Sequence, residues 1–157
     1  MVPGIRSGAV KFSKKTEYGL LALIDMAIQQ QRSAGGRLTT RDIAARQQIP
    51  ERFLEQQITA LRNAGLVHSH RGAAGGCSLA HRADDITVLE VVEALEGSLL
   101  EPATDAEGKG RPTPGSIREL VDRARTCLTE LYGSVTIADL ARRELDLSEQ
   151  DSLMFYV

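Results

Sequence analysis

Residues 38–80 constrain the fold of this chain most strongly, because two short helical patterns there run directly into a glycine-rich hairpin. In the second pattern, Leu54, Ile58 and Leu61 recur at helical spacing and can pack inward, whereas the opposite face is polar. Gly65 can adopt the left-handed conformation that ends a helix. Helix, turn, helix and hairpin in this order predict a winged helix-turn-helix unit.

The other parts of this unit follow from the same kind of pattern. The preceding helix is expected to begin near Thr40 as its N-cap and to bury Ile43 and Ala44. Residues 66–80 are expected to form the hairpin, with a glycine-rich turn over 72–76. Glycine permits positive φ and lets a backbone approach a phosphate closely. An ordinary hairpin beside an ordinary helix pair is the alternative interpretation.

Charge is divided unevenly between the two halves of the chain. Residues 1–82 carry twelve Lys and Arg against five Asp and Glu, a balance of +7, whereas residues 83–157 carry seven against sixteen, or −9. The overall pI near 5.9 would argue against a nucleic-acid partner if the charge were uniform. The positive half, however, contains the helix pair and the hairpin, which favours double-stranded DNA as the partner. Two differently solvated faces would be the alternative.

Length and composition exclude several classes of protein. A chain of 157 residues, 42% of them hydrophobic, can bury one core and is expected to form one compact domain with a helical extension. It contains no run of about 18 apolar residues that could span a membrane. The first ten residues lack a secretory pattern and there are two cysteines, so we expect a cytoplasmic protein. No nucleophile with a base and no Walker-type phosphate loop occurs, so we expect no enzyme activity.

Residues 11–27, 49–80 and 86–97 together resemble the Rrf2 family of bacterial transcription regulators. The specific features are the FLEQ, LR and AGLV groups within residues 53–67 and the R-G-x-x-G-G hairpin turn at residues 71–76. The resemblance implies a sequence-specific transcription regulator that acts as a homodimeric repressor on a palindromic operator. A winged-helix protein-interaction module that acts through its acidic C-terminal half is the alternative function.

The resemblance also implies which residues contact DNA. Arg52, Phe53, Glu55 and Gln56 occupy the positions nearest the bases, and Arg71 occupies the wing position. Glu55 could accept a hydrogen bond from cytosine N4, and Gln56 could pair with adenine. The other candidate DNA-binding residues are Lys14, Arg41, Gly72, Gly75 and Gly76.

The expected fold class is mainly α, with four consecutive parts. Residues 1–10 are expected to be a flexible arm, 11–97 the winged helix-turn-helix domain, 98–115 a mobile loop, and 116–157 a dimerisation helix with a C-terminal tail. An apolar stripe on the last part needs a partner to cover it. By resemblance this partner is a second copy, and packing on its own domain is the alternative. The stripe contains Ile117, Leu120, Val121, Ala124, Leu128 and Leu131.

Three further helices are expected outside residues 38–80. The first runs from about residue 13 to 30, and Thr87 with Glu90 forms a capping box for a helix that stops at Gly97. Thr136 is expected to cap a last short helix through Leu140. The buried surface of the first helix is expected to contain Leu20, Leu21, Ile24, Ala27 and Ile28.

Many members of the family bind an iron–sulfur cluster through three cysteines in the loop before the long helix. Residues 98–115 contain neither cysteine nor histidine, so we expect no cofactor and no metal. The chain therefore resembles the CymR type, whose signal comes through a protein. A metabolic enzyme is accordingly a candidate signalling partner.

The remaining cysteines and histidines are expected to have structural or solvated roles. Cys127 falls on the apolar stripe and is expected to be a buried packing residue. Cys77 is expected to be exposed beside basic residues, which makes it the candidate redox residue, although a structural role is favoured. His68, His70 and His81 lack metal-ligand spacing to any cysteine or carboxylate.

Overall fold

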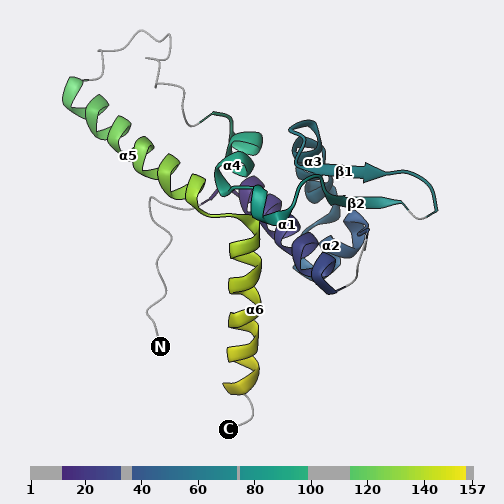
Figure 1. Ribbon diagram of the computed structural model, residues 1–157. Helices are drawn as coiled ribbons and strands as arrows, with labels where there is room; N and C mark the ends of the chain where they lie inside the picture. The colour runs from purple at the N-terminus through teal and green to yellow at the C-terminus, as the bar shows by residue number, and fades with distance from the viewer. Residues whose placement is uncertain (1–11, 33–36, 74, 99–113, 155–157) are drawn as a thin grey trace.

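The computed structural model describes residues 12–32, 37–73, 75–98 and 114–154 (Figure 1). The expected arm, the tip of the tail and nearly all of the expected loop lie outside these residues. Within them the fold is mainly helical with one antiparallel hairpin, as predicted. In chain order the elements are α1 (Lys14–Arg32), α2 (Thr40–Gln47), α3 (Glu51–Asn63), β1 (Val67–His70), β2 (Gly76–Leu79), a short 3-10 helix (Ala83–Asp85), α4 (Val88–Glu96), α5 (Gly115–Ser134) and α6 (Ile137–Met154).

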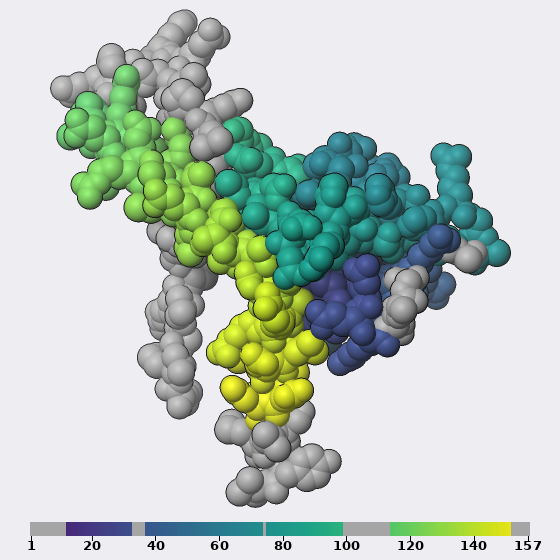
Figure 2. Space-filling view, viewed as in Figure 1, coloured from purple at the N-terminus to yellow at the C-terminus, as the bar shows by residue number. Residues whose placement is uncertain are grey.

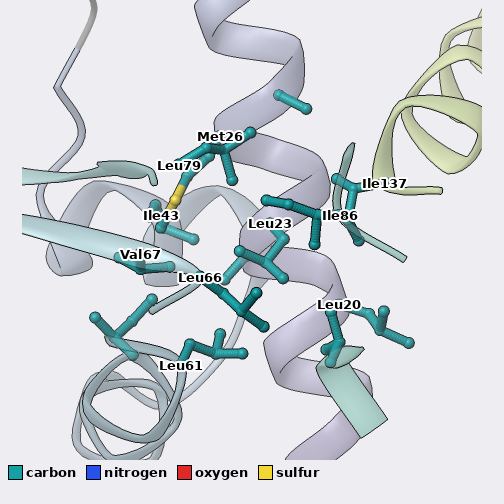
Figure 3. Close-up of a cluster of buried hydrophobic side chains, with 14 of the residues drawn as sticks. Leu20, Leu23, Met26, Ile43, Leu61, Leu66, Val67, Leu79, Ile86 and Ile137 are labelled. Atoms are coloured by element: carbon teal, nitrogen blue, oxygen red, sulfur yellow. The ribbon is translucent and has the colours of Figure 1, made fainter. Parts of the chain in front are cut away.

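Helix α1 is the centre of the hydrophobic core, with α2, α3, α4 and α6 packed around it (Figure 3). Leu23 is completely buried and Met26 nearly so. The sequence pattern placed Leu21, Ile24 and Ile28 on the buried surface, but these side chains are only half-buried. The difference arises because α1 has neighbours on several sides, whereas the pattern assumed a single apolar face.

The helix pair is formed as predicted except for its first cap. Ile43 and Ala44 of α2 are buried. The N-cap is Thr39 rather than Thr40, because the Thr39 hydroxyl accepts a hydrogen bond from the Asp42 N–H at 3.1 Å. After α2, Gln48 adopts a left-handed conformation with φ of 54°, which starts the turn into α3.

A glycine ends α3 and directs the chain into the hairpin, which we call the wing (residues 67–79). Gly65 has φ of 78° and donates its N–H to the Arg62 carbonyl, while Leu66 donates to the Leu61 carbonyl at 2.9 Å. These two bonds form a Schellman motif. In the wing, Val67 lies opposite Leu79 and the two strands are antiparallel.

The C-terminal part is attached to the core by a short β-bridge. Thr87 and Glu90 form the predicted capping box at the start of α4, and Thr87 pairs with Thr136. Thr136 caps α6 as predicted, but α6 is 18 residues long rather than a short helix ending at Leu140. Figures 1 and 2 show α5 extending from the core on the side away from the wing, whereas α6 runs downward from the core in this view.

Candidate nucleic-acid interface

The exposed face of α3 combines charged and amide side chains on a firmly anchored helix. Leu54 and Leu61 are completely buried and hold α3 against the core. On the opposite face, Arg52, Glu55 and Gln56 are exposed, and with Thr59 they line a shallow open hollow. Phe53, beside them in the sequence, is also exposed, at 54%. The four predicted site residues of α3 are thus all accessible.

Hydrogen bonds separate the polar side chains of α3 into engaged and available groups. The Thr59 hydroxyl donates to the Glu55 carbonyl at 2.8 Å, and the buried Gln57 amide donates to the Phe53 carbonyl at 3.2 Å. Among the described residues, no such bond engages the side chains of Glu55 and Gln56. Their acceptor and donor groups are therefore free for base edges. The sequence pattern placed Gln56 on this face, and the neighbouring Gln57, which the pattern did not select, is buried.

The wing glycines are required by the chain's own backbone. Gly72 has φ of 98°. A Cβ on Gly75 would lie 2.7 Å from the carbonyl oxygens of His70 and Gly72, and a Cβ on Gly76 would lie 2.7 Å from the Leu38 carbonyl oxygen. These contacts explain why glycine is needed at positions 75 and 76, with no need to invoke close approach to a DNA phosphate. Arg71, at the start of the turn, is exposed.

The remaining two basic candidates lie on other elements. Arg41 is exposed in the first turn of α2. Lys14 forms an exposed ion pair with Glu17 at 2.8 Å, and this hydrogen bond raises the pKa of Lys14. Its neighbour Lys15 donates to the Leu95 carbonyl of α4 at 3.2 Å. The predicted residues of α3 thus lie together. The lysines at the start of α1, in contrast, already bond to α1 itself and to α4.

Both cysteine predictions are wrong about exposure. Cys77 is 2% exposed, and its thiol donates to the Leu38 carbonyl at 3.1 Å. Burial raises the pKa of the Cys77 thiol to about 11, which disfavours the reactive thiolate. Cys127, expected to be buried, is exposed on α5. The Cys77 side chain lies on the inner face of β2 with Leu79, so it does not face the basic residues of the wing turn.

In the described ranges, no group of three or more His, Cys, Asp or Glu side chains is arranged to hold a metal ion. Of the helices in those ranges, none is both long and apolar enough to cross a membrane.

Comparison with known proteins identifies relatives over nearly the whole chain. The model of the Rrf2 family, described as an iron-dependent transcriptional regulator, matches residues 12–143. The HTH-type transcriptional regulator CymR of Bacillus subtilis is 36% identical over 148 residues, covering 94% of this chain and 100% of CymR. The regulator IscR of Cereibacter sphaeroides is 35% identical over 114 residues, or 73% of each chain.

Solved structures show the same similarity in three dimensions. The structure of CymR, described as the global cysteine regulator of B. subtilis, has a TM-score of 0.69 at 35% identity and covers 86% of this chain and 98% of that one. The structure of T. potens IscR has a TM-score of 0.68 at 32% identity, covering 87% and 89%. These relatives are transcriptional regulators rather than enzymes.

Proposed function

Because this chain belongs to the Rrf2 family of DNA-binding transcriptional regulators, we propose that it acts as a homodimeric repressor of a palindromic operator. In this proposal α3 enters the major groove and the wing contacts the adjacent backbone or minor groove. The observation that carries it is the exposed face of α3, where Arg52, Glu55 and Gln56 lie together on a helix fixed by buried leucines.

Phosphate contacts would come from basic side chains around this face. Arg41 at the start of α2 and Arg71 at the wing turn are both exposed. Arginine pairs with phosphate oxygens through two N–H groups, and such contacts position a protein on DNA without selecting its sequence. Sequence selection then falls to Glu55 and Gln56, with Phe53 available for apolar contact with a thymine methyl group.

The outer face of α5 supports assembly of two copies. No residue of α5 is buried, and Ile117, Leu120 and Leu131 are 49%, 65% and 56% exposed. Leu128 is only half-buried by its own chain. The predicted stripe therefore has an exposed part and, at Leu128, a part that the protomer itself partly covers. An exposed apolar face of this kind is stabilised by a symmetric partner, which also holds two α3 helices about 34 Å apart, one turn of DNA.

The two cysteines of this chain do not fit an iron–sulfur cluster. Cluster ligation needs about four thiolate or imidazole ligands. The chain has two cysteines, of which Cys77 is buried as a neutral thiol in the wing and Cys127 lies on α5. We therefore include a protein signal in the proposal, with a metabolic enzyme as the candidate partner.

The direct test is an electrophoretic mobility shift assay with the promoter of the protein's own gene. We expect a specific complex that is competed by unlabelled promoter and not by a shuffled sequence of the same composition. The double variant Glu55→Ala/Gln56→Ala should lose this preference while it remains folded, because both side chains are exposed. Absence of any complex with genomic promoter fragments would instead favour a protein-interaction module.

A further inference from the structure

The outer face of the wing brings two histidines and one serine together. His68 and His70 are two residues apart on β1, so their side chains project from the same face of the strand. Their ring centroids are 6.5 Å apart in an edge-on arrangement. We propose that this pair binds one divalent transition-metal ion, such as Ni²⁺, Cu²⁺ or Zn²⁺.

Ser78 completes the arrangement from the neighbouring strand. It lies directly opposite His68 in the hairpin register, yet its hydroxyl is 3.0 Å from Nε2 of His70. The His70 ring nitrogen is therefore directed across the hairpin toward the residue that faces His68. In the proposed site both imidazoles turn toward one ion above Ser78, and His70 exchanges its hydrogen bond with Ser78 for a bond to the metal.

The surroundings leave this face accessible to an ion. The buried residues Val67, Cys77 and Leu79 occupy the opposite face of the hairpin and fix it against the core. His68 is exposed and His70 is half-buried. The sequence pattern gave these histidines no metal-ligand spacing to a cysteine or carboxylate. It could not show that Ser78 lies opposite His68 and is also hydrogen-bonded to His70.

The chemistry favours nitrogen-preferring metals over calcium or magnesium. Imidazole is a suitable ligand for zinc, copper and nickel. A zinc–nitrogen bond is about 2.0–2.1 Å long. Two imidazoles leave the other coordination positions to water or to the serine hydroxyl. Protons compete with the metal for the ring nitrogens, so the affinity should fall as the solution is acidified.

The histidine pair lies beside Arg71, so a bound ion would affect DNA binding. Arg71 directly follows His70, so a bound dication adds positive charge beside a proposed phosphate or base contact. This consequence rests on the proposed function, whereas the metal site itself does not. Binding of the metal and binding of the operator should then strengthen each other by the same factor.

Isothermal titration calorimetry of the full chain with Ni²⁺ tests the site directly. The protein should carry no affinity tag and should contain Cys127→Ser, since that exposed thiol could also bind metal. We expect one ion per chain. His68→Ala and His70→Ala should each weaken binding at least tenfold, and the matched control His81→Ala, an exposed histidine outside the pair, should bind as the parent does.

Undetectable Ni²⁺ binding, or equal binding by the parent and both pair variants, would overturn the site. A separate fluorescence anisotropy titration with operator DNA, with and without Ni²⁺, measures the linkage. Tighter DNA binding with Ni²⁺ in the parent but not in His68→Ala would support the coupling. Unchanged DNA affinity at saturating Ni²⁺ would refute the coupling alone, and failure to bind DNA at all would refute the proposed function.

Discussion

Two guanidinium nitrogens of Arg46 in α2 donate hydrogen bonds to the Asp25 carboxylate of α1, at distances of 2.7 to 3.1 Å. The Asp25 side chain is only 4% exposed, whereas that of Arg46 is 37% exposed. The hydrogen bond to Asp25 raises the pKa of Arg46 above its usual value, which favours the charged guanidinium still further. This pair fixes the first helix of the helix-turn-helix on the central helix of the core.

Loss of this pair should destabilise the protein measurably. Arg46→Ala leaves the Asp25 carboxylate buried without its partner, and we expect a loss of about 2–3 kcal/mol, less than for a fully buried pair because Arg46 is partly solvated. Urea denaturation measures the change. Arg142→Ala is the control: its exposed ion pairs with Asp139 at 2.8 Å and Asp84 at 3.6 Å, and its hydrogen bond to the Ala138 carbonyl, should together contribute less than about 1 kcal/mol. Equal effects of the two variants would contradict the prediction.

Replacement of Leu120 by Asp should prevent dimer formation. Leu120 is 65% exposed in the single chain, so the change should leave the protomer folded while it places an unpaired charge in the proposed interface. Light scattering should show monomers and weaker operator binding. Thr126→Asp adds the same charge on an exposed part of α5 away from the stripe and should remain dimeric. A dimeric Leu120→Asp variant would mean that the interface lies elsewhere.

Substitution of Gln56 by Ala should relax sequence preference rather than weaken binding uniformly. A paired amide contact with adenine contributes about 1–3 kcal/mol of discrimination against other bases. We expect the loss at one base position in each half-site, measured by competition with single-base operator variants. Uniform loss over all operator variants would instead assign Gln56 to the DNA backbone.

Operator binding should weaken with salt, and Arg71 should contribute to that dependence. If Arg71 contacts a phosphate, Arg71→Ala should reduce the slope of log K against log salt by about 1. If it reads a base edge, the variant should lose about 1–3 kcal/mol and some specificity. Arg82→Ala is the control, because Arg82 is exposed just after the wing and pairs with Asp84 at 3.5 Å. Parent-like binding by Arg71→Ala would remove Arg71 from the interface.

Burial of Cys77 predicts a loss of stability at alkaline pH. Its pKa is raised from 9.0 to about 11, so the unfolded chain releases this proton at lower pH than the folded protein does. The contribution is therefore complete below pH 9 and is lost as pH rises through 11, by roughly 3 kcal/mol in total. Urea denaturation at pH 8 and pH 10.5 should show this decrease in the parent, and a smaller one in Cys77→Ala. An identical decrease in both would contradict the assignment.

Local sequence patterns determined the elements that form the proposed DNA-binding surface. The spacing of Leu54, Ile58 and Leu61 identified the buried face of α3, and Gly65 identified its end. The capping box of Thr87 with Glu90 was also predictable. Each of these features depends on residues within about two helical turns of one another, so a single segment contains the necessary information.

Tertiary contacts determined which side chains are buried and which residues from distant segments lie together. Cys77 is buried because Leu38, 39 residues earlier, pairs with its backbone and accepts its thiol hydrogen bond. Likewise, the hairpin register places Ser78 opposite His68, and a hydrogen bond across the hairpin joins Ser78 to His70. The position of α5 on the core separates Leu128 from the more exposed Leu131. Exposure is a property of the neighbours that surround a side chain, and those neighbours are chosen by the folded chain as a whole rather than by the local pattern.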